Sequence, residues 1–234
     1  MTGRRDELAG NLALVRDRLD AACREAGRAP RDVTLVAVTK TFPASDVRLL
    51  AELGITDVGE NRDQEAAPKH ETCRDLPLRW HFVGQLQRNK ARSVASYADV
   101  VHAVDRLPLV AALSAAAEAA GRELTALIQV SLDVSHDAGR GGAEPDFVRE
   151  IASTLASAPG LRLGGVMGVA PLGADPRSAF AALADVAARI RADHPAATII
   201  SAGMSGDLEA AVAHGATHVR IGTALLGRRP SPVG

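Results

Sequence analysis

The chain has 234 residues, of which 47% are hydrophobic and 24% are charged, and its formal net charge at pH 7 is −1. This composition is typical of soluble globular proteins and excludes the disordered and fibrous classes. The near-zero net charge gives no bulk electrostatic reason to expect nucleic acid or an anionic membrane as a partner.

Nothing near the N-terminus reads as a targeting segment. The first residues carry charges where a signal peptide needs an apolar core, and no run approaches the roughly 18 apolar residues of a membrane helix. Cys23 and Cys73 lie in no CxxC pair or zinc-ligand spacing, so no metal site is predicted. We therefore expect a cytoplasmic protein in a reducing compartment.

The chain opens with a helix over about residues 3–27, because apolar residues recur at helical spacing until Gly27 and Pro30. Strand and helix patterns then alternate to the end. The predicted strands cover 33–38, 55–59, 78–84, 99–104, 124–132, 161–168, 197–201 and 217–222. The helices between them cover 44–54, 62–71, 89–98, 106–121, 144–159, 176–194 and 206–215.

This strict alternation predicts a parallel sheet, because parallel strands need a crossover connection. Eight such units in 234 residues favour a single, closed (β/α)8 TIM-type barrel over an open, doubly wound sheet. The barrel would span about residues 33–229 and follow the extra N-terminal helix. No linker rich in Pro, Gly or Ser divides the chain, so we expect one domain over 1–234.

The chemistry of such a barrel sits where strands run into the following loops. Lys40 follows the first predicted strand, "GEN" (59–61) the second, and His81 lies in the third. A lysine at this rim loses hydration, which lowers its pKa from about 10.4 and frees the amine to condense with an aldehyde. The alternative for Lys40 is an ordinary ion-paired or snorkelling lysine.

Two loops rich in glycine and hydroxyl groups follow the last two predicted strands, where barrels commonly bind phosphate. The first, "SAGMSGDLEAA" (201–211), offers the hydroxyl of Ser201 or Ser205, and the second offers Gly222 and Thr223. Helix capping is the alternative role of Ser205 and Thr223.

Three further candidates have alternatives that the sequence leaves open. Arg220 lies at the end of a predicted strand and could form a salt bridge to an acidic neighbour. His81 could be a hydrogen-bonded core histidine. Asn61 could serve only as the cap of the next helix.

Six motifs occur in order from Val36 to Gly227: "VAVTK", "GEN…QE", "WHFVGQLQRNK", "GVMG", "SAGMSGDLEAA" and "VRIGTALLG". Together they resemble the pyridoxal phosphate homeostasis protein family, which is similar to the barrel domain of alanine racemase. The resemblance implies a fold type III barrel that binds pyridoxal 5′-phosphate (PLP), with the cofactor carried as a Schiff base on Lys40.

The resemblance also implies that the loops bearing Ser205, Gly222 and Thr223 hold the phosphate, and that Arg220 faces the pyridine nitrogen. A guanidinium with a pKa above about 12 cannot deliver a proton to that nitrogen, so the ring stays neutral and carbanion chemistry is restrained. The other candidate cofactor-binding residues are Asn61, His81, Met167, Ser201 and Met204.

Two departures from the family pattern are local. Arg62 stands where many members have tyrosine, and the segment 135–142 differs from the stretch often seen there. A racemase on this barrel also needs a second base, typically a tyrosine contributed with a separate β domain. The only tyrosine, Tyr97, is predicted in a helix away from the rim, and the chain ends seven residues after Gly227.

We therefore expect a PLP carrier or regulator in vitamin B6 homeostasis without robust catalysis. Its expected partners are PLP, other B6 vitamers and apo-enzymes that receive the cofactor, and we expect a monomer or weak dimer. The first alternative is a slow PLP-dependent amino-acid racemase that lacks one base. The second is a cofactor-free aldolase in which Lys40 forms a Schiff base with a sugar phosphate.

Overall fold

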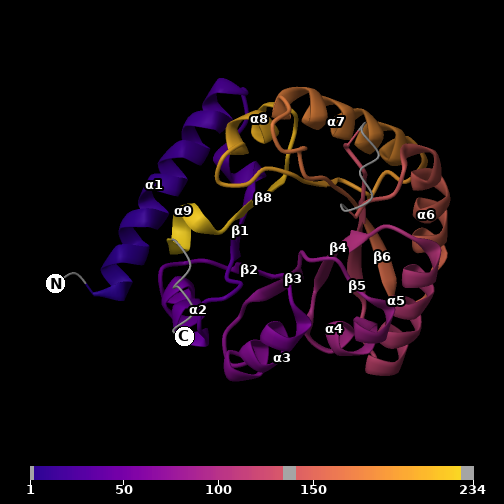
Figure 1. The fold of residues 1–234 in the computed structure, drawn as a ribbon, viewed down its shortest axis with the longest axis horizontal. Helices are drawn as coiled ribbons and strands as arrows, with labels where there is room; N and C mark the ends of the chain where they lie inside the picture. The colour runs from indigo at the N-terminus through magenta and orange to yellow at the C-terminus, as the bar shows by residue number, and fades with distance from the viewer. Residues whose placement is uncertain (1–2, 134–140, 228–234) are drawn as a thin grey trace.

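The computed structural model describes residues 3–133 and 141–227, in which strands and helices alternate (Figure 1). The strands are β1 (Thr34–Val38), β2 (Asp57–Glu60), β3 (Arg79–Phe82), β4 (Val100–Val104), β5 (Leu124–Gln129), β6 (Leu161–Met167), β7 (Ile199–Ser201) and β8 (His218–Ile221). The α-helices are α1 (Arg4–Glu25), α2 (Ala44–Glu52), α3 (Asp63–Thr72), α4 (Ala91–Tyr97), α5 (Leu107–Ala120), α6 (Pro145–Ser157), α7 (Pro176–Asp193), α8 (Leu208–Ala213) and α9 (Thr223–Leu226). Two 3-10 turns, η1 (Pro30–Asp32) and η2 (Arg88–Lys90), precede β1 and α4.

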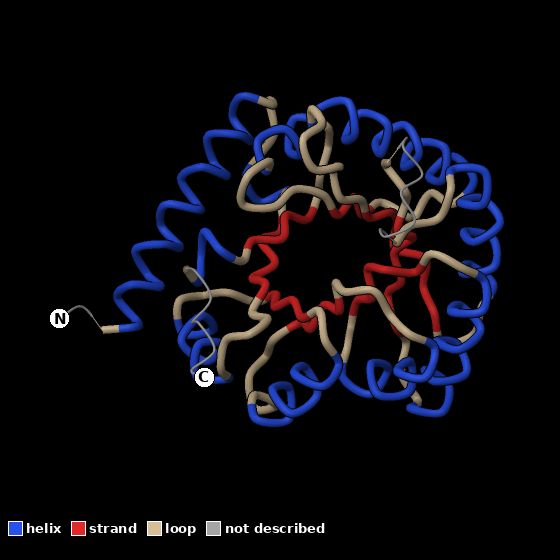
Figure 2. The backbone as a smooth tube through the Cα atoms, viewed as in Figure 1, coloured by secondary structure: helices blue, strands red, loops and turns tan. Residues whose placement is uncertain are grey.

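The sheet closes into a barrel. Each strand pairs in parallel with the next one along the chain, and β8 pairs with β1 (Figure 2). In the closing pair, Thr34 lies opposite His218 and Val36 lies opposite Arg220. Helices surround this ring of strands, and α1 precedes the βα alternation. The predicted barrel with an extra N-terminal helix is therefore confirmed.

Helix α1 packs against α8 and α9, the last two described helices (Figure 1). Its buried apolar stripe recurs at spacings of three and four residues, as a helix that covers a core requires. The stripe contains Leu8, Leu12, Val15 and Leu19. Two polar contacts add to it: Asn11 Nδ2 donates to the carbonyl of Leu225 and Arg4 Nη2 to that of Leu226, each at 3.0 Å. Helix α1 thus braces α9.

Most of the apolar core lies between the strands and the surrounding helices. A much smaller apolar cluster contains Val100, Ala103, Leu127 and Met167. A second, polar group lies inside the barrel: Asp57, His81, His102, Ser201, His218 and Arg220. Contacts across the barrel place it there, because the His102–Ser201 hydrogen bond and the His81–His218 ring contact join strands that are not neighbours. Branched aliphatic side chains dominate most TIM-barrel interiors. A polar interior must instead satisfy its donors and acceptors by internal hydrogen bonds.

The observed elements differ from the predicted ones mainly at their ends. The fifth strand stops at Gln129, three residues earlier than predicted, and the last stops at Ile221. Helix α9 is absent from the prediction, because four residues are too few to show a helical period.

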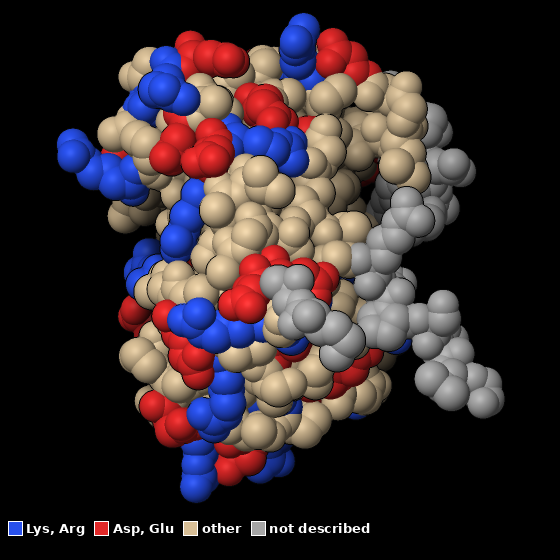
Figure 3. All heavy atoms as spheres, turned by 90° about the vertical axis from the view of Figure 1, so that its left-hand side faces the viewer, with Lys and Arg blue, Asp and Glu red and all other residues tan. Residues whose placement is uncertain are grey.

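Charges of both signs are interspersed on the face seen in Figure 3, which is the left-hand side of Figure 1. Helix α1 forms ion pairs there, with Arg5 paired to Glu52 and Arg18 to Glu209. This mixing agrees with the near-zero net charge and leaves no single-sign field on that face. None of the described helices combines the length and hydropathy needed to cross a membrane.

Close approach of two strands requires glycine at position 165. Gly165 has a φ of +143°, and a Cβ built on it would lie 2.0 Å from the carbonyl oxygen of Ile199.

We expect Gly165→Ala to lower the free energy of unfolding by roughly 2 kcal/mol or more, measured by urea denaturation. Gly10→Ala is the control: Gly10 is exposed within α1 with open space around it. That change should stabilise by about 0.5 to 1 kcal/mol, and equal effects at both sites would contradict the argument.

Candidate functional site

A cavity of about 380 Å³ opens at the C-terminal ends of the strands, where barrel enzymes place their active sites. The loops after β1, β2, β3, β6, β7 and β8 contribute its walls. Its volume is within the range of about 300 to 1,000 Å³ of small-molecule sites. Eight of the ten residues predicted from the sequence line it: Lys40, Asn61, Met167, Met204, Ser205, Arg220, Gly222 and Thr223.

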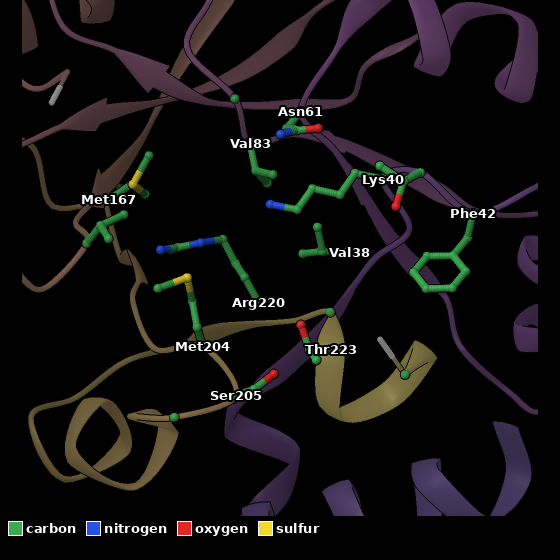
Figure 4. A pocket seen from close by; sticks show the side chains of 16 residues that line it. Val38, Lys40, Phe42, Asn61, Val83, Met167, Met204, Ser205, Arg220 and Thr223 are labelled. Carbon is green, nitrogen blue, oxygen red and sulfur yellow. The ribbon is translucent and has the colours of Figure 1, made fainter. Parts of the chain in front are cut away.

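The Lys40 side chain extends into this cavity, and its amine lies on the same side as Asn61 and Val83 (Figure 4). The backbone around it is held on both flanks. Thr39 N–H donates to the carbonyl of Gly59 at 2.9 Å, and Thr41 N–H donates to Glu65 Oε2 at 3.0 Å. Thr41 has a φ of +69°, a conformation that is uncommon for a non-glycine residue and is often found at functional sites. The lysine therefore stands on a constrained loop.

A buried ion pair supports the same loop from beneath. Lys69 Nζ lies 2.5 Å from Glu60 Oε1 and donates to the carbonyl of Thr39 at 2.9 Å. The Thr39 hydroxyl donates to the same Glu60 oxygen at 2.6 Å. Burial raises the pKa of Glu60, an effect that the Lys69 ammonium opposes. The other carboxylate oxygen, Oε2, is buried without a hydrogen-bond partner.

The sequence did not predict Glu60, Glu65 and Lys69 as supports of Lys40. Glu60 and Glu65 lie inside the "GEN…QE" motif, from which only Asn61 was singled out. A carboxylate at the end of a fully buried strand was an available signal, since such a group needs a partner. The packing of α3 on the barrel decides which cation becomes the partner of this carboxylate.

The other end of the cavity presents hydroxyls and bare backbone from the loops after β7 and β8. The hydroxyls of Ser205 and Thr223 both face the cavity (Figure 4). Ser205 Oγ accepts the N–H of Ala224 at 3.2 Å, which joins the two loops and leaves the hydroxyl hydrogen to donate. Gly206 and Gly222 allow close approach to the backbone. Arg18 of α1 donates to the carbonyl of Ser205 at 3.1 Å and so anchors this loop.

Arg220 reaches the cavity from β8, with only 5% of its surface exposed. Nη1 donates to Ser201 Oγ at 2.7 Å and Nη2 to the carbonyl of Gly168 at 3.0 Å. Burial lowers the pKa of Arg220 to about 10, with Asp207 opposing the shift. The guanidinium therefore remains charged at neutral pH. It has five N–H donors, so these two bonds leave others for a ligand.

His81 and Ser201 are the two candidate residues that do not line the cavity; both are buried in the barrel interior below it. His81 Nε2 lies 2.9 Å from Asp57 Oδ1, and Ser201 Oγ accepts from Arg220. The structure thus gives His81 the position of a hydrogen-bonded core histidine, because its side chain points inward from the middle of a strand. A direct contact of either residue with a ligand stays a prediction.

The charge of the cavity favours an anionic ligand. Lys40 and Arg220 are its charged residues, and no acidic side chain is among the described residues that line it. Val38, Val83 and Met167 add apolar walls that suit a planar ring (Figure 4). An amine, a guanidinium and two hydroxyls around such walls match an aldehyde that carries an aromatic ring and a phosphate.

Arg62, one of the two departures from the family pattern, lies outside the cavity lining. Arg62 precedes α3 with an exposed side chain 3.4 Å from Glu65. Of the segment 135–142, only Gly141 and Gly142 are among the described residues. Tyr97 ends α4, as predicted, and its hydroxyl lies 3.5 Å from Asp63. Burial raises the pKa of Tyr97.

Known proteins resemble the chain over nearly its full length. The family model of the alanine racemase N-terminal domain matches residues 11–230. The pyridoxal phosphate homeostasis protein of Mycobacterium tuberculosis is 44% identical over 245 residues, covering 97% of this chain and 94% of that protein. That of Escherichia coli (strain K12) is 38% identical over 234 residues, covering 96% and 97%.

Solved structures give the same result for the fold. PipY of Synechococcus elongatus with PLP bound has a TM-score of 0.82 and 35% identity, covering 94% of this chain and 100% of that one. Alanine racemase from Corynebacterium glutamicum has a TM-score of 0.68 and 16% identity, covering 98% of this chain and 62% of that one. At this lower identity the similarity shows the shared barrel alone.

Removal of one partner from the buried ion pair should be costly. Lys69→Met leaves the Glu60 carboxylate without its cation in the interior, and we expect a loss of roughly 3 to 5 kcal/mol in the free energy of unfolding. The double variant Lys69→Met/Glu60→Leu should recover much of this loss. Arg74→Met breaks the exposed Arg74–Glu71 pair as a control and should cost little. Urea denaturation of the four proteins measures these effects; equal losses for Lys69→Met and Arg74→Met would refute a structural role for the buried pair.

Proposed function

Because the chain belongs to the pyridoxal phosphate homeostasis protein family, we propose that it binds PLP in the cavity at the barrel rim, as a Schiff base on Lys40, and serves vitamin B6 homeostasis. The observation that carries the proposal is the convergence of one amine, one guanidinium and two hydroxyls on a cavity whose described lining residues include no acidic side chain. When bound, PLP supplies a reactive aldehyde on an electron-withdrawing pyridine ring.

In this proposal, different residues bind different parts of the ligand. Lys40 supplies the amine for the aldehyde from a loop that Glu60, Lys69 and Glu65 hold in place. The phosphate lies against Ser205 and Thr223, where hydroxyls and glycine backbone offer hydrogen-bond donors. The apolar walls exclude water from the ring between these ends.

Arg220 faces the pyridine nitrogen as a hydrogen-bond donor. Its pKa of about 10 keeps the proton on the guanidinium at neutral pH. The ring then stays uncharged, which weakens it as an electron sink and restrains reactions of amino acids at the site. This choice of ring partner favours holding the cofactor over using it in catalysis.

A carrier role also agrees with the position of the only tyrosine. Tyr97, at the end of α4, is buried against Asp63 of α3 and lies outside the cavity lining. It is therefore not placed to act as a second base there. A racemase that lacks one base would lose about 10² to 10⁴ in rate. In the cytoplasm that the sequence predicts, we propose that the protein buffers the reactive aldehyde and passes it to apo-enzymes.

Covalent labelling tests the attachment site. The sequence has three lysines, Lys40, Lys69 and Lys90, so the assignment is simple. After addition of PLP and borohydride reduction, mass spectrometry of the digest should find the label on Lys40 alone. Lys40→Ala should lose both the label and the visible absorbance band of bound PLP, whereas Lys90→Ala should keep both. A label that persists in Lys40→Ala at the wild-type level would show that another amine holds the cofactor.

Turnover tests the carrier role. Incubation of the PLP-loaded protein with L- or D-alanine, or with L-serine, should give no sustained racemisation at ordinary enzyme rates of about 1 to 10³ s⁻¹. Chiral chromatography of the amino acid against time measures this. Multiple turnovers in that range would favour the racemase alternative.

A further inference from the structure

A chain of four hydrogen bonds crosses the barrel interior beneath the cavity. Arg220 Nη1 donates to Ser201 Oγ at 2.7 Å, and Ser201 Oγ lies 3.0 Å from His102 Nδ1. His102 Nε2 lies 2.8 Å from His81 Nδ1, and His81 Nε2 lies 2.9 Å from Asp57 Oδ1. All five side chains are buried, and they come from β8, β7, β4, β3 and β2.

This series of hydrogen bonds runs from the cavity toward the opposite face of the barrel. Arg220 lines the cavity at the C-terminal ends of the strands. Asp57 is the first residue of β2, and it lines two separate hollows of about 350 and 430 Å³ beside Thr56. Residues near the N-terminal ends of β1 and β3 line these hollows, so they lie at the other end of the barrel. The interior bonds thus connect the two faces.

The two ends together set the direction of the bonds between them. A guanidinium only donates and a carboxylate only accepts, so the Ser201 oxygen accepts from Arg220 and Asp57 accepts from His81 Nε2–H. With one hydrogen on each ring, the hydrogen of Ser201 then points to His102 Nδ1. His102 then carries its hydrogen on Nε2 and donates to His81 Nδ1. His81 carries its hydrogen on Nε2 and donates to Asp57, which accepts as a carboxylate. Both rings carry a hydrogen on Nε2 in this arrangement.

The charges at the two ends agree with this direction. Burial lowers the pKa of His102 well below its ordinary value, which keeps the ring neutral. Burial opposes ionisation of Asp57, but hydrogen bonds from His81 and Thr56 together with nearby positive charge outweigh it, and the pKa of Asp57 is lowered. Arg79 also lies 3.9 Å from that carboxylate. The series of hydrogen bonds therefore has a cation, Arg220, at the cavity end and an anion, Asp57, at the far end.

We infer that Ser201, His102, His81 and Asp57 are positioning residues that fix the guanidinium of Arg220 toward the ligand. Each intervening dipole has its negative end toward Arg220 and its positive end toward Asp57, so all of them stabilise both end charges and strengthen one another. One N–H of Arg220 is thereby committed to Ser201 and a second to the carbonyl of Gly168. The remaining donors are held in one orientation, and the inference that they face the ring of PLP rests on the proposed function.

The tautomers can be tested without any ligand. In ¹⁵N-histidine-labelled protein, two-bond ¹⁵N–¹H correlation spectra distinguish Nδ1–H from Nε2–H rings, and His81→Gln and His102→Gln assign the two signals. We expect neutral Nε2–H rings for both residues at pH 7.5. A protonated ring or an Nδ1–H tautomer at either position would overturn the bond direction.

The positioning role is tested with PLP, by binding titration and by the absorbance spectrum of the bound cofactor. Ser201→Ala removes one of the two acceptors of Arg220 and should weaken binding about tenfold or more, with a shifted absorbance band, because hydrogen bonds to charged groups are strong. Ser201→Thr keeps the hydroxyl and should behave as the wild type. Asp57→Asn, at the far end, should change the spectrum in the same direction as Ser201→Ala.

Asp99→Asn is the matched control for the far face. Asp99 lines the same hollow as Asp57, but it accepts hydrogen bonds from the Trp80 N–H and from Arg122 and takes no part in the series from Arg220 to Asp57. It should leave the spectrum and the affinity unchanged. If Asp57→Asn does not fold, His81→Gln replaces it in the same assay. Wild-type spectra and affinities in Ser201→Ala and the far-end variant would overturn the inference while the function stands; absence of a Lys40 label in the wild type would instead refute the function.

Discussion

The buried guanidinium of Arg220 is the constraint around which the interior of this barrel is organised. A cation with 5% of its surface exposed must keep hydrogen-bond acceptors within reach or lose its charge. Ser201 and the carbonyl of Gly168 provide two of them, and a polar chain extends from Ser201 to Asp57. The interior therefore holds few apolar side chains, and the stability of the fold rests mainly on the layer between strands and helices.

Polar contacts also hold the loops at the rim of the barrel. Lys40 stands on a loop that is fixed by Glu65 on one flank and by the Lys69–Glu60 pair beneath Thr39. The loops at the opposite end of the cavity are braced from outside by α1, through Arg18 and through the contacts of Asn11 and Arg4 with α9. The N-terminal helix, which lies outside the βα alternation, thus contributes to the order of the proposed phosphate site.

A site built in this way is suited to holding a ligand in one orientation. Its amine and its guanidinium are both supported by buried polar groups, and the described residues of its lining include no carboxylate. The single tyrosine serves the packing of α4 against Asp63. These features suit the cavity to an anionic ligand, in agreement with the proposed function.

The sequence by itself determined the eight-stranded barrel, the helix before it and the rim position of Lys40, because periodicity and the order of elements place strand ends without further information. It also identified eight residues that meet in one cavity. Only the tertiary structure decided that His81 and Ser201 lie below that cavity, and that Lys69 pairs with Glu60. Which side chains meet inside a barrel depends on the register between strands far apart in the chain, and alternation along one strand carries no information about that register.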